Sequence, residues 1–189
     1  MMIKREIGRL RCFFVFIGLC IAAPALAQSP DAIVNYRDYS ALYSSSGQPT
    51  EAQLETLKAH HFERVIYLAY NDDETSLSGE DRIVKKLGME YVHIPVAWEA
   101  PTSNDFYMYA AIMAQAAEKK TLLHCQVNYR ASAFSFMYRV IYQDIPLADA
   151  KEDMNSVWAP NETWRTLIFE VLQENGISPY CDVCDWEVQ

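Results

Sequence analysis

The sequence contains little of the residues that characterise fibrous or disulfide-held proteins. Its 189 residues include only six glycines, eight prolines and five cysteines. A collagen-like chain needs far more glycine and proline, and a disulfide-dense scaffold needs far more cysteine. Side chains are 51% hydrophobic and 22% charged, which argues against a disordered chain. Without internal repeats or low-complexity stretches, the composition predicts an ordinary globular protein.

Long hydrophobic runs are also absent. The most apolar stretch, Cys12–Ala23, has 12 residues, whereas a membrane-spanning helix needs roughly 18. Four basic residues precede this stretch, and Ala25-Leu26-Ala27 follows it. This order is typical of a secretory signal peptide with an A-x-A cleavage site. We predict a signal peptide at 1–27, a periplasmic or secreted mature protein, and no stable membrane anchor after cleavage; the alternative is a retained anchor.

The rest of the chain is strongly acidic. The signal segment carries four basic residues and one acidic residue, so its removal changes the net charge from −9 to −12. This charge argues against nucleic acid as a partner. The remaining length suits one domain. We expect that domain at 28–176, followed by a tail at 177–189.

Three cysteines remain after the signal segment. Export implies an oxidising compartment, so we expect Cys181 and Cys184 to form a structural disulfide; a redox pair is the alternative. The two cysteines would supply only two zinc ligands, with no histidine near them in sequence, so we predict no metal site and no cofactor. Cys125 is left unpaired, which is unusual for an exported protein.

Predicted strands and helices alternate along the chain. Strands are expected at Val65–Ala69, Tyr91–Val96 and Thr121–His124, and helices begin near Thr50, Ser78, Pro101, Ala131, Leu147 and Asn161. Such alternation predicts an α/β fold, a single domain whose central, mostly parallel sheet has helices on both faces. Binding sites in such sheets form at the carboxyl ends of strands. Here that points to the residues after Leu123 and after Ile94.

One segment between a predicted buried strand and a predicted buried helix carries reactive side chains. It reads His124-Cys-Gln-Val-Asn-Tyr-Arg130-Ala-Ser132. A loop entering a helix directs its N–H groups and the positive end of the helix dipole at one point, which binds anions and stabilises a thiolate. Cys125 is then a partly exposed nucleophile, and Arg130 can bind two oxygens of a tetrahedral anion. Alternatively, Cys125 is a small core residue, because C-x4-R spacing is common.

Other residues of the segment have expected roles as well. Asn128 occupies a position where φ is expected to be positive. Ser132 is placed to donate a hydrogen bond to the cysteine sulfur when it leaves. Tyr129 should line the mouth of the pocket, and His124 is a candidate for orienting the thiolate.

The segment resembles the signature of the cysteine-dependent, dual-specificity-like protein tyrosine phosphatases. The resemblance extends to Ser46–Leu54, to the strand around Val65, and to Ile94-Pro-Val96 followed by Trp98–Pro101, which are similar to a bacterial branch with a short HC-x4-R loop. It covers roughly 33–172. It implies a dual-specificity-phosphatase-like fold and a hydrolase that acts on phosphomonoesters, including protein phosphotyrosine or phosphoserine.

The resemblance also implies a mechanism. Cys125 attacks phosphorus and forms a cysteinyl-phosphate, while Arg130 stabilises the equatorial oxygens. The phosphate-binding residues it implies are Gln126, Val127, Asn128, Tyr129, Arg130 and Ser132. An acid on the preceding loop protonates the leaving oxygen. The family expects an aspartate there, but the first carboxyl in this sequence is Glu99, which we predict to be the general acid, with Asp105 as the second candidate.

The loop length leaves two alternatives open. The general signature has five residues between cysteine and arginine, whereas this chain has four. Four is also the spacing of rhodanese-like sulfurtransferases, in which Cys125 would carry a persulfide. The other alternative is a non-catalytic anion-binding module, whose shortened loop has lost the geometry for in-line attack.

Overall fold

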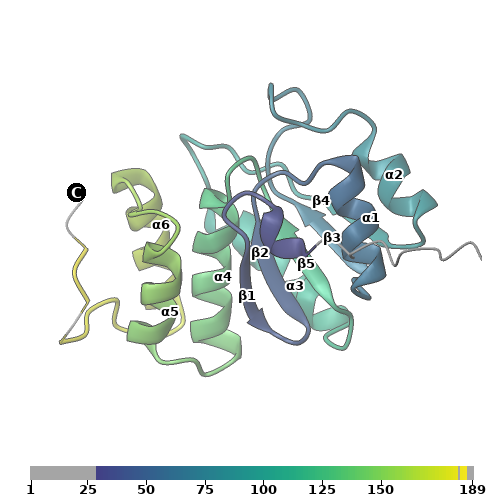
Figure 1. The fold of residues 1–189 in the computed structure, drawn as a ribbon. Helices are drawn as coiled ribbons and strands as arrows, with labels where there is room; N and C mark the ends of the chain where they lie inside the picture. The colour runs from purple at the N-terminus through teal and green to yellow at the C-terminus, as the bar shows by residue number, and fades with distance from the viewer. Residues whose placement is uncertain (1–28, 183, 187–189) are drawn as a thin grey trace, which may run out of the picture.

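The computed structural model describes residues 29–182 and 184–186, which form one five-stranded sheet and six α-helices (Figure 1). The strands are β1 (Arg37–Ser40), β2 (Tyr43–Ser46), β3 (Arg64–Tyr67), β4 (Glu90–His93) and β5 (Thr121–His124). The helices are α1 (Glu51–Ala59), α2 (Glu80–Lys86), α3 (Ser103–Gln115), α4 (Tyr129–Tyr142), α5 (Leu147–Asn155) and α6 (Glu162–Glu174), with a short 3-10 helix η1 (Pro30–Ala32) before β1. The predicted signal peptide at 1–27 lies outside the described residues.

The strands are arranged in the order β1-β2-β5-β3-β4. The pairs β2–β5, β5–β3 and β3–β4 are parallel, and β1 pairs antiparallel with β2. The expectation of a mostly parallel sheet is confirmed. β5 is the central strand, so the residue that follows it emerges in the middle of the sheet edge.

The sequence did not predict β1 and β2. All four residues of β2, Tyr43–Ser46, are buried, but three serines in a row do not form the apolar run that identifies a buried strand. Their hydroxyls find partners across the β1–β2 pair. The Ser44 hydroxyl donates to Asp38 at 2.8 Å, and the Ser45 hydroxyl pairs with the Tyr39 hydroxyl at 2.9 Å. Pairing with neighbouring strands therefore decides the conformation of β2.

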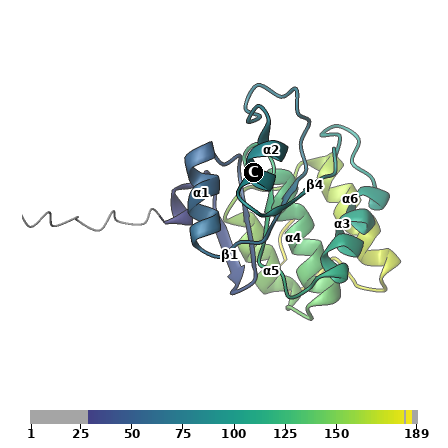
Figure 2. The ribbon, with the colours of Figure 1, turned by 90° about the vertical axis from the view of Figure 1, so that its right-hand side faces the viewer.

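Helices cover both faces of the sheet, as expected (Figure 1). On one face α1 and α2 pack against β3 and β5 through Leu54, Leu57, Val65, Val84 and Leu122. The other face carries the larger hydrophobic cluster, and in Figure 2 α3, α4 and α6 lie together on that side. Val65 and Ile66 of β3, and Leu122 and Leu123 of β5, thus belong to different clusters, which is the pattern of a sheet covered on both sides.

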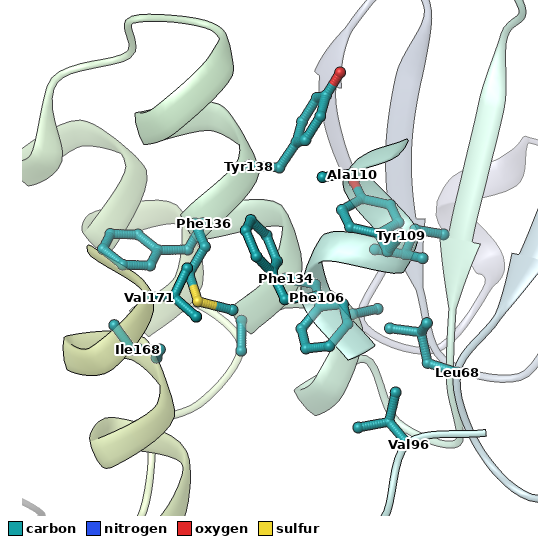
Figure 3. Close-up of a cluster of buried hydrophobic side chains, with 14 of the residues drawn as sticks. Leu68, Val96, Phe106, Tyr109, Ala110, Phe134, Phe136, Tyr138, Ile168 and Val171 are labelled. Carbon is teal, nitrogen blue, oxygen red and sulfur yellow. The ribbon is translucent and has the colours of Figure 1, made fainter. Parts of the chain in front are cut away.

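The central helix of the larger cluster is α4 (Figure 3). Its Phe134 packs edge-on against Phe106 of α3, with ring centroids 5.6 Å apart. Its one arginine beyond the first turn, Arg139, is buried and forms an ion pair of 2.7 Å with Asp153 of α5. Burial on nearly every side holds α4 in place, so the residues at its N-terminus are positioned firmly.

The starts of the helices lie near the predicted residues, and α2 begins two residues later than expected. Thr50, near which a helix was expected to begin, caps α1 and forms a capping box with Gln53, and Asn161 caps α6. We expected Ser78 to open α2, but the helix begins at Glu80 after Gly79, which has φ of 72° and makes no side-chain cap. Glycine reaches this left-handed conformation without strain from a Cβ atom, so the chain turns there instead.

The tail after α6 packs on the domain. Cys181 and Cys184 are joined by a disulfide. Trp186 lies edge-on to Phe136 of α4 and Phe169 of α6, with centroid distances of 5.9 and 5.1 Å. In the described part of the chain, no helix combines the length and apolar character that crossing a bilayer requires.

Candidate active site

The carboxyl ends of the four parallel strands meet at one edge of the sheet. His124 at the end of β5 lies beside Ser46 of β2 and Tyr67 of β3, and Tyr67 lies beside His93 of β4. The loops after these strands therefore open to one space. A cavity of about 370 Å³ lies there, and the residues that line it are Asp73, Trp98, Cys125, Gln126, Val127, Tyr129 and Arg130.

Cys125 follows β5 directly and lines this cavity. Its N–H donates to the Ser46 carbonyl at 3.3 Å, which holds the start of the loop against β2. We predicted a partly exposed thiol, and this was wrong, because the side chain is only 1% exposed. The loop and the first turn of α4 close around it. A reactant therefore has to enter the cavity to reach the sulfur.

Asn128 makes the turn from the loop into α4. Its φ is 72°, in the left-handed region, as the sequence predicted. The side chain does not cap the helix. Instead its amide donates to the Asn35 carbonyl at 2.6 Å, and the Asn35 amide donates to the Val127 carbonyl at 2.9 Å. The N–H groups in the first turn of α4 are therefore left without a side-chain cap and are suited to bind an anion.

Arg130 lies in the first turn of α4 and is buried. Its Nε donates to the Val96 carbonyl at 3.0 Å, and its Nη1 donates to Gln126 Oε1 at 3.2 Å. The guanidinium carbon lies 5.4 Å from the ring centroid of Trp98, a cation–π arrangement. The four-residue spacing thus brings Arg130 into the cavity of Cys125, in an orientation set by the loop between β4 and α3.

Tyr129 and Trp158 form an aromatic wall beside the cavity, and Ser132 is hydrogen-bonded to both residues. The Ser132 hydroxyl donates to the Tyr129 carbonyl and accepts from Trp158 Nε1, both at 3.1 Å. Its single proton is therefore not directed at the Cys125 sulfur, in contrast to our expectation. The Tyr129 ring stacks on Trp158 at 4.7 Å, with an angle of 7° between the planes.

Gly47, which sequence reasoning missed, packs closely against the backbone of the loop between β5 and α4. A Cβ atom on Gly47, just after β2, would lie 2.8 Å from the Gln126 carbonyl oxygen and 3.1 Å from Val127 Cα. The next residue, Gln48, donates its N–H to the same carbonyl at 2.9 Å. Gly47 stands inside the Ser46–Leu54 segment that supports the family resemblance, so the signal was present in the sequence.

His124, the residue before Cys125, forms a buried ionisable pair with Glu80. The His124 ring stacks on Tyr67 at a centroid distance of 4.7 Å, and its Nε2 lies 3.2 Å from Glu80 Oε1 without hydrogen-bond geometry. Burial raises the pKa of Tyr67 to about 12, and the negative charges of Glu80, Asp73 and Cys125 add to the effect. Tyr67 thus lies within electrostatic reach of both an acidic loop residue and the cysteine.

The carboxyl groups near the cavity are placed differently from our expectation. Glu99 is exposed and is not among the residues that line the cavity. Asp105 caps α3, because its Oδ2 accepts from the N–H and the hydroxyl of Thr102 at 2.9 and 2.8 Å. Asp73, in the loop after β3, lines the cavity, and sequence reasoning did not single it out. The rule that sites form after parallel strands applies equally to β3 and would have indicated this loop.

Metal-binding geometry is not found around the site. No group of three or more histidine, cysteine, aspartate or glutamate side chains within 29–182 and 184–186 is arranged to hold a metal ion. The disulfide of the tail lies away from Cys125, at a separate cavity of about 440 Å³. That cavity is lined by Arg165, Phe169, Tyr180, Cys184 and Trp186.

Comparison with known families identifies the relatives of this chain. The family model described as "DSP-PTPase phosphatase fused to NAD+ Kinase" matches residues 24–165. The match spans every residue that lines the cavity of Cys125. A search of curated protein sequences gave no significant match.

Solved structures show the same relationship. A "Putative phosphatase (DUF442)" from Shewanella putrefaciens CN-32 is 32% identical with a TM-score of 0.70, covering 77% of this chain and 95% of that chain. Tk-PTP in its active form (20% identity, TM-score 0.61, 75% and 95% covered) and the core catalytic domain of the PP-IP phosphatase SIW14 from S. cerevisiae (13%, 0.61, 76% and 94%) share the fold. The chain therefore belongs to the cysteine-dependent, dual-specificity-like protein tyrosine phosphatase family, whose members are hydrolases.

Proposed function

We propose that this protein is an exported phosphatase that hydrolyses phosphomonoesters through a cysteinyl-phosphate intermediate. The observation that carries the proposal is the position of Cys125, which shares one cavity with Arg130 at the uncapped N-terminus of α4. A nucleophile and an anion-binding site in the same cavity are the two parts that the reaction needs. Membership in the phosphatase family supports the reaction class.

The proposed reaction uses the cavity in two steps. The Cys125 thiolate attacks phosphorus and displaces the alcohol, while the α4 N–H groups and Arg130 hold the non-bridging oxygens. Water then attacks the cysteinyl-phosphate and releases inorganic phosphate. Arg130 is suited to this because Val96 and Trp98 fix the plane of its guanidinium before substrate arrives. Gln126 gives up its contact with Nη1 when the anion binds.

The walls of the cavity suggest what carries the phosphate. Trp98, Tyr129 and Val127 line it beside the anion site, so an aromatic or apolar group attached to the phosphate finds apolar surface there. A phosphorylated protein, with phosphotyrosine as the best-fitting residue, or a small aryl phosphomonoester is the proposed substrate. The acidic chain does not attract such anions from a distance, so binding depends on the local field of α4 and Arg130.

A persulfide-carrying sulfurtransferase is the second candidate, and the four-residue loop favours it. A direct test gives the purified protein an aryl phosphate in one assay and thiosulfate with cyanide in another. We expect phosphate release and no thiocyanate, and we expect Cys125→Ser to abolish release while still binding inorganic phosphate. Acid-quenched enzyme should carry one phosphoryl group on Cys125 by mass spectrometry. Thiocyanate formation would establish the sulfurtransferase instead, and anion binding without either product would indicate a non-catalytic module.

Export rests on the predicted signal at 1–27. The disulfide between Cys181 and Cys184 is compatible with an oxidising compartment and supports the proposal. Expression of the full chain in a Gram-negative host should yield a periplasmic protein whose N-terminal residue is Gln28. A full-length cytoplasmic product would refute export and leave the proposed reaction untouched.

A further inference from the structure

One oxygen of the Asp73 side chain lies buried without a partner. Among the residues that line the cavity of Cys125, Asp73 alone carries a carboxyl group. Its Oδ2 is buried and has no hydrogen-bond partner among the described residues. Buried polar atoms nearly always have partners, and an unpaired one calls for an explanation. The missing partner is explained if a substrate oxygen occupies that place.

The backbone around Asp73 holds the side chain at this position. The Asp73 N–H donates to the Tyr70 carbonyl at 3.2 Å, and the Ser76 N–H donates to the Asp73 carbonyl at 3.0 Å. Tyr67, the last residue of β3, donates its hydroxyl to the same Tyr70 carbonyl at 3.0 Å. The turn that carries Asp73 is therefore tied to the strand beside β5, so it is fixed relative to Cys125.

The electrostatic surroundings of Tyr67 agree with the shared cavity of Asp73 and Cys125. The negative charges of Asp73 and of Cys125 both disfavour ionisation of the same phenol, that of Tyr67. Glu80 acts on Tyr67 in the same way, but its carboxyl is buried against His124 and does not line the cavity. Tyr129 and Arg130 are the other ionisable groups that line it. Asp73 is therefore the carboxyl that shares the cavity with the nucleophile.

We propose that Asp73 is the general acid and base of this active site, in place of the carboxyl that the family pattern leads one to expect after β4. The proposal rests on the phosphatase function proposed above. Glu99 stands on the surface, and the Asp105 carboxyl is engaged in capping α3. The loop after β3 can supply the acid because its residue Asp73 lines the same cavity as Cys125.

The proton moves in both steps of the reaction. As the Cys125 sulfur forms its bond to phosphorus, the bond from phosphorus to the leaving oxygen breaks and its electron pair stays on that oxygen. Asp73 gives its proton to this oxygen, and the neutral alcohol departs. The carboxylate then takes a proton from the attacking water, whose oxygen bonds to phosphorus. The sulfur–phosphorus bond breaks, the thiolate returns, and inorganic phosphate leaves with Asp73 protonated again.

The test compares two esters that differ in their need for a proton. Phenyl phosphate has a poor leaving group, whereas an electron-poor aryl phosphate such as 2,4-dinitrophenyl phosphate departs without protonation. For Asp73→Asn we expect kcat/KM on phenyl phosphate, which covers only the steps up to the cysteinyl-phosphate, to fall by about 10²–10⁴-fold, the usual contribution of an acid. The loss of kcat/KM on the dinitrophenyl ester should stay below about tenfold, whereas kcat should fall on both esters because they share the hydrolysis step. The alkaline limb of the pH–rate profile on phenyl phosphate, which reports loss of the acid's proton, should disappear in the variant.

Matched variants separate this role from damage to the loop. Asp72→Asn changes the neighbouring exposed carboxyl and should leave both rates unchanged. Vanadate binding and the melting temperature of Asp73→Asn should match those of the wild type, which shows that the cavity is intact. Glu99→Gln and Asp105→Asn are measured on the same two esters.

The outcomes distinguish this inference from the proposed function. Equal losses of kcat/KM on both esters for Asp73→Asn, or no loss on either, would overturn the inference. The wild-type rates would still support the proposed phosphatase function. A selective loss for Glu99→Gln or Asp105→Asn with Asp73→Asn unaffected would transfer the role to that residue. Wild-type protein that releases no more phosphate than Cys125→Ser would overturn the proposed function and the inference together.

Discussion

At the residue scale, Arg130 is oriented before any substrate is bound. Its Nε reaches the Val96 carbonyl, its Nη1 reaches Gln126, and its plane lies over Trp98. Each contact depends on the flat guanidinium with its fixed set of donors. The side chain therefore has little conformational freedom to lose when it binds an anion.

We expect Arg130→Lys to lower kcat/KM on an aryl phosphate by about 10²–10³-fold, the usual effect of removing one group that stabilises transition-state charge. An ammonium group is a point charge that cannot hold the Val96 carbonyl and two phosphate oxygens in one plane. Vanadate affinity, measured by inhibition, should weaken too. Arg82→Lys, on the exposed surface of α2, is the control and should leave both values unchanged. Full activity in Arg130→Lys would show that the short loop keeps the arginine away from the phosphate.

At the element scale, the loop between β5 and α4 depends on the segment after β2. Gly47 leaves no space for a side chain, because backbone atoms of Gln126 and Val127 occupy the place of its Cβ. Gln48 and Asn35 add hydrogen bonds to the backbone of the same loop. The shape of the anion site is therefore set partly by residues before β1 and after β2, which are far from the loop in the chain.

We expect Gly47→Ala to lower the free energy of unfolding by about 1–3 kcal/mol, because the added methyl group has to push the Gln126 carbonyl aside. Displacing the loop should also lower kcat/KM by about 10²-fold, a usual effect of misplacing reacting groups by an ångström. Urea unfolding and steady-state kinetics measure the two effects. Gly176→Ala is the matched control, since Gly176 has positive φ but no neighbouring atom within 4 Å of the added Cβ. It should lose stability and keep its activity. A loss of stability without a loss of activity in Gly47→Ala would show that the loop tolerates the shift.

At the scale of the whole molecule, buried tyrosines connect the sheet to the helices. Tyr43 of β2 shares hydrogen bonds with Tyr109 of α3 and Ser135 of α4. Burial raises the pKa of Tyr43, Tyr109 and Tyr91, and that of Tyr67 to about 12. The free energy of unfolding of this protein therefore depends on pH through the ionisation of its buried tyrosines.

We expect the free energy of unfolding to fall as the pH rises from about 10 to about 12. In this range the unfolded chain releases tyrosine protons near the ordinary pKa of 10.0, whereas the folded protein retains them. The folded state then binds more protons, so a rise in pH favours unfolding. The contribution of Tyr67 is complete below about pH 10 and is lost toward pH 12. Urea unfolding at several pH values should show a smaller pH slope for Tyr67→Phe.

The exposed Tyr180 provides the control for this measurement, because Tyr180→Phe should leave the slope as it is in the wild type. An unchanged slope in Tyr67→Phe would show that this phenol ionises equally easily in the folded and unfolded states.

The local signals in the sequence were sufficient for much of the fold and for part of the site. The alternation of strands and helices predicted the layered sheet, and the segment from His124 to Ser132 predicted where Cys125, Asn128 and Arg130 come together. The start of α1 near Thr50 was also predicted. Each of these features depends on residues close together in the chain, whose propensities and spacing are visible in sequence.

What escaped prediction depends on contacts between distant segments. Three consecutive serines become a buried strand only because β5 lies beside them. Trp158, on another part of the chain, donates to the Ser132 hydroxyl oxygen, a contact that the local sequence around Ser132 does not reveal. Gly47 is required only because the loop after β5 crosses it.

The reactive groups of this protein could be predicted from sequence, namely a cysteine and an arginine at the start of a buried helix, in a family of phosphatases. Their surroundings follow from the fold: how deeply Cys125 is buried, which aromatic rings form the wall, and which carboxyl shares the cavity. A helix start is built from neighbouring residues, whereas a cavity is enclosed by loops that the sheet order brings together. The sequence favoured Glu99 over Asp73, but of these two carboxyls only Asp73 lines the sulfur's cavity.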